Sequence, residues 1–229
     1  MQRCFAPGVL PSGGGNGGKE VSVSDSATTK TCGLRDPRPA AKRVLEAAKD
    51  LFYRQGIRAT GVEEVCRVAG TTKMSLYRAF PSKDALVEAI LHEDCAAEEL
   101  WYGPVLRGEM PAPERPMAFL RAAAAALRSP GFRGCPMALA IVEFPDACHP
   151  ARKVADARKH TMRQLLRDLC AGAGAADPAA LGDSMLLLVE GAFAAVPYLG
   201  GEAAARALEQ TGETVLAAGL PQAAAAASG

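Results

Sequence analysis

Four side chains of different chemistry recur at helical spacing within one short stretch of the sequence. They are a cation, a thioether, a phenol and a guanidinium, at Lys73, Met74, Tyr77 and Arg78. Because residues three and four apart are neighbours on a helix, these side chains share one outward face. Arginine and lysine bind the acceptor edge of guanine, and an apolar group such as methionine can contact the methyl group of thymine. The pattern therefore favours a surface that reads base edges in a DNA groove.

Two short helical patterns position this face. Val62, Val65 and Ala69 recur at spacings of three and four, which predicts one buried side of a helix. Gly70 follows as a residue that readily adopts a positive φ at a helix end. The second pattern places Leu76 inward, opposite the polar face. Two short helices joined by a tight turn that contains glycine make a helix-turn-helix.

An ordinary helical hairpin with a solvated outer face would show the same short pattern, and the distribution of charge separates the two interpretations. Residues 37–83 carry ten basic and four acidic side chains, a net charge of +6. Residues 84–229 carry twelve basic and eighteen acidic ones, a net charge of −6. A basic segment attached to an acidic one is typical of a nucleic-acid-binding domain joined to a domain that does not bind nucleic acid.

Residues 43–91 form the run RVLEAAKDLFYRQGIRATGVEEVCRVAGTTKMSLYRAFPSKDALVEAIL, in which an AG turn is followed by LYRAFPSK. This run, and above all its AG turn and LYRAFPSK motif, resembles the DNA-binding domain of the TetR (tetracycline-repressor) family of bacterial transcriptional regulators. The chain departs from the family pattern at Met74, where a small residue is usual, and at Ala79, where histidine is frequent. A weaker similarity covers residues 134–150, GCPMALAIVEFPDACHP, which resemble the start of the ligand-binding half of some members.

The resemblance also implies roles for individual residues. It suggests phosphate contacts by Thr60, Thr72, Tyr77 and Lys83, and positions near base edges for Thr71, Lys73, Met74, Ser75 and Arg78. Phosphate contacts position a protein on DNA, whereas base contacts specify the sequence. The resemblance further implies a homodimer on a palindromic double-stranded DNA operator, acting as a repressor and released by a small-molecule inducer. The alternative from another class is an architectural protein that binds DNA without sequence preference.

The whole sequence predicts an all-α protein, with an N-terminal three-helix helix-turn-helix domain followed by an α-helical ligand-binding and dimerisation domain. We expect a disordered extension over residues 1–36, the DNA-binding domain over 37–83, the ligand-binding and dimerisation domain over 84–220, and a disordered tail over 221–229.

Local signals predict where the helices begin and end. The first is expected from Pro39 to Gln55, the second after a capping box of Thr60 and Glu63, the third after Thr72, and the fourth from Ser82 to about Glu99. A loop is predicted over residues 102–116. Further helices are predicted near 114–128, 135–144, 150–171, 178–199 and 202–218, with Pro197 expected to kink or end the helix that contains it.

The last two predicted helices carry apolar side chains on most of their surface. A helix of this kind must be covered on several sides, either at the centre of the body or at a subunit interface. We favour a two-fold interface in which the pair from each subunit forms a four-helix bundle. The residues expected there are Leu181, Met185, Leu188, Ala192, Ala195, Leu208 and Val215.

Soft and aromatic side chains of the predicted body either pack as a plain core or line a cavity. The family resemblance favours an inducer pocket, and the small number of charges in these stretches favours a mainly apolar inducer. The residues expected to line the pocket are Trp101, Met117, Phe119, Met137, Phe144 and Phe193.

The seven cysteines include no C-x-x-C pair, and their odd number indicates reduced thiols in the cytoplasm. Cys66 and Cys170 fall in apolar helix patterns and are expected in the core. Cys135 and Cys148 bracket one short helix, so a thiol-based redox sensor of the same fold is a further alternative. No metal or other cofactor is expected.

Other function classes lack their usual signals. A phosphate-binding glycine loop, a nucleophile elbow and an H-E-x-x-H motif are all absent from the sequence, so an enzyme is not expected. We also expect no signal peptide and no span of about 20 apolar residues that crosses a membrane.

Overall fold

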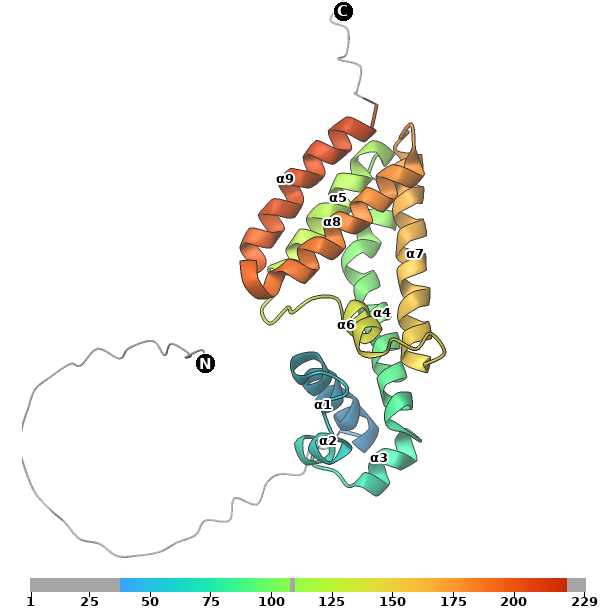
Figure 1. Ribbon diagram of the computed structural model, residues 1–229, viewed down its shortest axis with the longest axis vertical. Coiled ribbons are helices and arrows are strands. Elements are labelled where there is room, and N and C mark those ends of the chain that lie inside the picture. The colour runs from blue at the N-terminus through green and yellow to red at the C-terminus, as the bar shows by residue number, and fades with distance from the viewer. Residues whose placement is uncertain (1–37, 108–109, 222–229) are drawn as a thin grey trace, which may run out of the picture. The chain divides into compact units, whose positions relative to one another are not determined.

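The part of the chain that the computed structural model describes, residues 38–107 and 110–221, contains nine α-helices and one short 3-10 helix (Figure 1). No β-strand occurs among these residues, so the predicted all-α fold class is confirmed. The predicted disordered extension over residues 1–36 lies outside the described residues. So does the predicted tail over 221–229, apart from Pro221.

Three helices form the head, namely α1 (Ala40–Gln55), α2 (Val62–Val68) and α3 (Lys73–Ala79). Each contributes to one shared core, in which Val44, Val65 and Leu76 have no exposed surface. Helix α1 ends at Gly56 as predicted, because the φ of +98° at this position favours glycine. The predicted start of α2 is wrong, since Gly61 precedes the helix and no side chain caps it.

The body begins with α4 (Lys83–Arg107), a helix longer than predicted. The Ser82 hydroxyl accepts a hydrogen bond from the Ala85 N–H at 3.0 Å, which confirms the predicted cap. The predicted end near Glu99 is wrong, because the helix continues through Pro104 into the predicted loop. Tyr102 is buried on this extra turn, and its ring packs against that of Phe119 with centroids 5.8 Å apart. Tertiary packing therefore overrides the helix-breaking signals of this segment.

The remaining helices of the body begin and end within two residues of the predicted limits. They are α5 (Arg115–Leu127), preceded by the 3-10 helix Ala112–Glu114, then α6 (Pro136–Glu143), α7 (Pro150–Gly172), α8 (Pro178–Leu199) and α9 (Gly201–Gly219). Helix α8 runs between α7 and α9, and α5 packs against α9 (Figure 1). Pro197 lies inside α8 and does not end it.

Helices α7 and α8 approach each other closely and are joined by ion pairs. Asp183 on α8 accepts hydrogen bonds from both Arg163 and Arg167 on α7, with the shortest N–O distances 2.6 and 2.7 Å. These hydrogen bonds hold the pKa of the Asp183 carboxyl well below its usual range. The charged side of α7 is thus partly used to bind α8.

Four of the seven residues predicted to form a dimer interface are instead buried within the single chain. Leu181, Met185, Ala195 and Leu208 belong to its core. The other three, Leu188, Ala192 and Val215, are half-buried and pack against that core. The periodicity did not identify the outward side, because a helix that is apolar nearly all round presents a stripe on every side.

Judged by length and composition alone, α8 is able to cross a membrane. This corrects the expectation that no segment of the sequence is long and apolar enough. In the described residues α8 packs on α5, α7 and α9, and its Asp183 is paired with two arginines. Burial of its inner side accounts for part of its apolar composition, whereas Leu187 on its outer side is 73% exposed.

The close approach of α7 and α8 depends on Gly182. A Cβ atom at this position would lie 2.7 Å from the backbone nitrogen of Arg167, and backbone cannot move aside as a flexible side chain can. We expect Gly182→Ala to lower the free energy of unfolding by about 1–3 kcal/mol, the usual effect of overpacking. Thermal or denaturant unfolding at a fixed protein concentration measures this change.

Gly172→Ala is the matched control, because no atom lies within 4 Å of the Cβ that it would add at the end of α7. Alanine is the better helix former, so this change should be neutral or raise the free energy of unfolding by up to about 1 kcal/mol. Equal effects of the two substitutions would contradict the close approach.

Candidate nucleic-acid interface

The turn between α2 and α3 is held by backbone hydrogen bonds and by one arginine. Gly70 has a φ of +58°, and the Thr71 N–H donates to the Cys66 carbonyl at 3.0 Å. This pattern is typical of a helix that ends at a glycine. Arg43 on α1 donates to the Ala69 carbonyl at 3.0 Å and to the Gly70 carbonyl at 3.4 Å. The turn is therefore fixed to α1 as well as to its own helix.

Helix α3 buries one side and exposes the other. The Thr72 hydroxyl accepts a hydrogen bond from the Ser75 N–H at 3.2 Å, which confirms the predicted cap. Leu76 points into the head and leaves Met74 75% exposed and Tyr77 44% exposed on the opposite side. The structure brings the predicted contact residues of this helix onto one surface. Thr72, Lys73, Met74, Tyr77 and Arg78 are exposed, and Thr71 and Ser75 are half-buried beside them.

One cation of this surface already has a partner. Lys73 forms an ion pair with Glu63 on α2, a contact that sequence reasoning did not identify. The hydrogen bond from Lys73 lowers the pKa of Glu63, and Glu63 raises that of Lys73. Because both side chains are largely exposed, water and salt screen the pair, and a phosphate or base can replace Glu63 at little cost.

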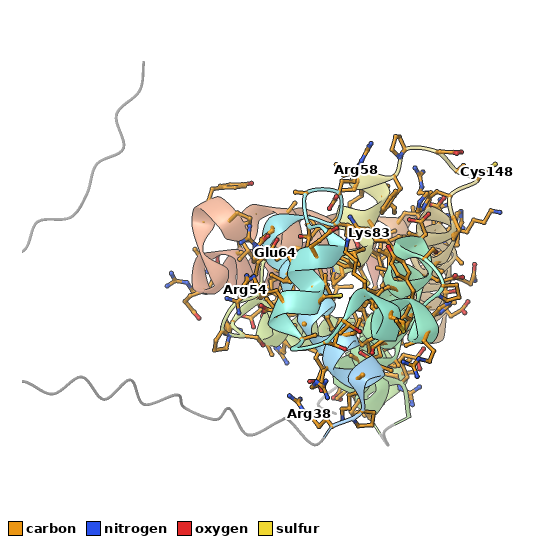
Figure 2. The ribbon with its side chains drawn as sticks, turned by 90° about the horizontal axis from the view of Figure 1, so that it is seen from below. Arg38, Arg54, Arg58, Glu64, Lys83 and Cys148 are labelled. Carbon is orange, nitrogen blue, oxygen red and sulfur yellow. The ribbon has the colours of Figure 1, made fainter. Side chains whose placement is uncertain are left out.

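Thr60 and Lys83 take up structural positions at the junction of the head and α4. Thr60 is fully buried and its hydroxyl donates to the Gly56 carbonyl at 2.8 Å, so we do not retain this side chain as a phosphate contact. The Lys83 ammonium donates to the Thr60 carbonyl at 2.7 Å and lies over the Phe52 ring. Its burial lowers its pKa. In the view from below, the labelled Arg38 and Arg54 lie towards the outside of the molecule and Lys83 lies further inward (Figure 2).

Two side chains that the sequence analysis did not single out connect the head to the body. The Glu143 carboxylate, at the end of α6, accepts hydrogen bonds from the Ile57 N–H at 2.8 Å and the Arg58 N–H at 2.7 Å. The Tyr53 hydroxyl on α1 accepts from the Arg133 N–H at 2.6 Å and donates to the Gly134 carbonyl at 2.9 Å. We call these contacts the Glu143 tether and the Tyr53 tether. Glu143 lies within residues 134–150, the segment that resembles the start of the ligand-binding half of some family members. That resemblance is the sequence signal that could have identified it.

The predicted ligand pocket is only partly assembled. Trp101, Phe119, Met137 and Phe193 surround a common cavity, but its volume is only about 20 Å³. That volume holds about one water molecule. The other two predicted residues lie elsewhere, since Met117 faces the end of α9 and Phe144 stacks on His149 with ring centroids 3.9 Å apart. The predicted pocket is thus closed in this structure.

The cysteines fall into different environments. Cys66 and Cys170 are buried as predicted, and burial raises the pKa of the Cys170 thiol to about 11. Cys135 is also buried, and Lys159 donates a hydrogen bond to its sulfur at 3.2 Å while pairing with Glu190. Burial by itself lowers the pKa of Lys159, but Cys135 and Glu190 outweigh this effect and raise it. Cys148 is exposed at the edge of the molecule (Figure 2).

Within the described residues, no group of three or more histidine, cysteine, aspartate or glutamate side chains has the arrangement of a metal site. The described part of the chain also leaves no buried side-chain nitrogen or oxygen without a hydrogen-bond partner. The features that remain for chemistry are the exposed side of α3 and the clefts between helices.

The fold and this surface define a helix-turn-helix protein with an all-helical body. The family model described as bacterial regulatory proteins, tetR family, matches residues 44–90. A TetR-family transcriptional regulator from Streptomyces coelicolor is 31% identical in sequence, with a TM-score of 0.75 over 79% of this chain and 95% of that one. A TetR-type regulator from Streptomyces avermitilis is 32% identical, with a TM-score of 0.68 over 80% of this chain and 98% of that one. The chain therefore belongs to the TetR family.

Among curated proteins the similarity is confined to a segment. The transcriptional regulator RutR of Escherichia coli K12 is 36% identical over 78 residues, which are 33% of this chain and 35% of RutR. The match thus spans about a third of the length of such relatives. The family model matches the segment that holds the head, whereas the two Streptomyces structures match most of this chain.

The Glu143 tether leads to a first test of how the head is held. Glu143→Ala removes the acceptor of the Ile57 and Arg58 amides, and a hydrogen bond to a charged group contributes about 1.5–3 kcal/mol. We therefore expect hydrogen exchange at these two amides to become at least about tenfold faster. Exchange measured on peptides that cover residues 56–61 checks this.

Val142→Ala is the control, because Val142 precedes Glu143 on the same helix and is 80% exposed. It should leave the exchange of these amides unchanged. If Glu143→Ala leaves it unchanged as well, the tether does not hold the head in solution.

Proposed function

We propose that the protein is a DNA-binding transcriptional regulator that acts as a homodimer on a palindromic operator and represses transcription until a small-molecule inducer releases it. The observation that carries the proposal is the exposed outer side of α3, with Met74, Tyr77 and Arg78 held outward by the buried Leu76. This helix belongs to a segment with a net charge of +6, which favours approach to phosphate. Family membership supports the same function.

The proposed contacts divide into two groups. Thr72 and Tyr77 are exposed at the start and outer side of α3, where they suit phosphate oxygens, and Lys83 adds positive charge behind them. Thr71, Lys73, Met74, Ser75 and Arg78 are the candidates for base edges. An arginine that binds two acceptors of guanine contributes about 1–3 kcal/mol of discrimination between bases, whereas a phosphate contact contributes affinity for any sequence.

We place the dimer interface on the outer side of α8 and the neighbouring side of α9. Leu187, Gly191, Ala194 and Tyr198 are exposed and recur at spacings of four, three and four, so they form one stripe. Leu187 is 73% exposed and Tyr198 is 76% exposed, so two large apolar side chains of this stripe lie uncovered on the single chain. Together with the small exposed residues Ala207 and Ala218 of α9, this stripe suits a four-helix bundle between two subunits.

A dimer explains how so small a reading surface selects an operator. One recognition helix contacts only a few base pairs, and a two-fold pair on half-sites about one helical turn apart multiplies affinity and specificity. An inducer then has to change the separation of the two heads only slightly. A coupling free energy of about 1–3 kcal/mol lowers operator affinity about 5- to 150-fold. A regulator of this kind acts in the cytoplasm, without enzymatic activity or a bound cofactor.

Footprinting on the DNA upstream of the protein's own gene tests the function and supplies the operator. We expect a short palindromic footprint. Uniform coating of the DNA would instead support an architectural protein, and no protection at any protein concentration would contradict DNA binding.

Substitutions on α3 test the division of roles. Tyr77→Ala removes a proposed phosphate contact and should weaken binding to the operator and to scrambled DNA by similar factors. Arg78→Ala should lower operator affinity by about 1–3 kcal/mol and change which base is preferred at one position in each half-site. Titrations of both variants against operator, single-base variants and scrambled DNA measure these effects, and identical profiles would contradict the two roles.

The proposed interface is tested at Leu187. In a dimer, Leu187→Glu would bury a charged side chain in the interface, whereas on a single chain the same side chain stays solvated. The substitution should therefore shift the protein to monomers and remove most operator affinity. Val142→Glu is the matched control, since Val142 is equally exposed but lies on α6. Sedimentation analysis over a range of concentrations gives the oligomeric state. A wild-type protein that is monomeric at every concentration and on DNA would contradict the dimer.

A further inference from the structure

A cleft of about 420 Å³ lies between α1 of the head and helices α4 and α6 of the body. We call it the junction cleft. Its volume falls in the range of about 300–1,000 Å³ that small-molecule sites have, whereas the cavity in the core of the body holds about one water molecule. In this conformation the junction cleft offers room for a small molecule, whereas the cavity that the predicted pocket residues surround does not.

The wall of the junction cleft is mainly apolar. Its apolar lining comes from three elements, with Phe52 and Ile57 from the head, Val87 and Ile90 from α4, and Leu139 from α6. Leu139 is 37% exposed although it is a large apolar residue, so part of the wall meets solvent. Covering this surface with an apolar ligand would remove it from water, which is the main favourable contribution to binding in such sites.

The charged groups of the junction cleft favour a cation over an anion. Four of the five charged residues that line it are acidic, and two of these, Glu46 and Asp50, also pair with Arg38 and Arg54 at its rim. Among them Asp94 is the most enclosed, at 9% exposed, and its carboxylate is paired with the Lys49 ammonium at 2.6 Å. Burial raises the pKa of Asp94, and the hydrogen bond from Lys49 offsets part of this effect. The Lys49 side chain is 38% exposed and is able to turn into solvent when another cation replaces it.

The position of the junction cleft relates it to the attachment of the head. Tyr53 and Glu143 both line it, and both make the hydrogen bonds that join α1 and the following linker to the body. A molecule that separates α1 from α6 would therefore lengthen the hydrogen bonds of both tethers. Because each tether ends on the backbone of the head or the body, this movement would turn the head relative to the body.

We propose that the junction cleft is a binding site for an apolar small molecule that carries one protonated amine, which replaces Lys49 at Asp94. The apolar part of the molecule packs on Phe52, Ile57 and Leu139. Occupation of the cleft loosens the Tyr53 and Glu143 tethers and moves the head. The consequence for DNA rests on the proposed function, whereas the binding itself does not.

Three probes of the same shape and different charge test the site, namely 4-phenylbutylammonium, 4-phenylbutanol and 4-phenylbutyrate. Calorimetric titration into the full chain without DNA measures their affinities. We expect the ammonium to bind about tenfold more tightly than the alcohol, because it alone brings a positive charge to the Asp94 carboxylate, and the carboxylate to bind most weakly. Equal affinities for the three probes, or no binding by any of them, would overturn the proposal.

Two substitutions locate the binding. Asp94→Asn should remove the preference for the ammonium and leave the affinity for the alcohol within about twofold. Leu139→Trp should fill the cleft and abolish binding of both probes. Val142→Trp, on the exposed side of the same helix, should leave binding unchanged. Binding that survives Leu139→Trp, or that disappears with Val142→Trp, would show that the probe binds elsewhere.

The consequence for DNA is measured separately. Saturating 4-phenylbutylammonium should lower operator affinity about 5- to 150-fold in the wild type and in Val142→Trp, but not in Leu139→Trp. If the ammonium binds the cleft and leaves operator affinity unchanged, the coupling to the head is overturned. Failure of the protein to bind any operator, with probe binding intact, would overturn the proposed function and leave the site itself supported.

Discussion

The Glu143 carboxylate accepts hydrogen bonds from two consecutive backbone amides of the linker after α1, and the relation between head and body depends on this contact. A carboxylate has acceptor positions for both amides and replaces the water that would otherwise solvate them. The Tyr53 hydroxyl makes a comparable contact at the other end of α6, with one backbone donor and one backbone acceptor. Apolar packing on α4 brings the head and the body together, but packing is not directional. The directional hydrogen bonds fix the angle between them.

Local signals predicted most of the helices, because the relevant interactions lie within a few residues. The Thr72 cap, the Ser82 cap and the glycine ends of α1 and α2 are contacts of this kind. The two errors in helix limits have different causes. At the start of α2 two local contacts compete, and the Thr60 hydroxyl binds the Gly56 carbonyl behind it and does not cap the helix that follows. At the end of α4 a distant residue decides, because Tyr102 packs against Phe119, and this partner is not visible in a local pattern.

In the candidate site, too, sequence spacing predicted the local features and missed the contacts between different helices. The exposed side of α3 follows from the position of Leu76 and was predictable from spacing alone. The ion pair of Lys73 with Glu63 and the tethers of Tyr53 and Glu143 join different helices, and sequence spacing carries no information about such contacts. The outward side of α8 was not predictable either, since both sides of that helix are apolar. Only the packing of α7 and α9 shows which stripe remains free within the described chain.

The close contact of α7 and α8 at Gly182 has a mechanical consequence. With no side chain between the backbones, and with Asp183 binding two arginines of α7, these helices have little freedom to slide. We expect this pair to act as a stiff frame. Any movement of the head would then be taken up in α4 and α6, and not by sliding of α7 on α8.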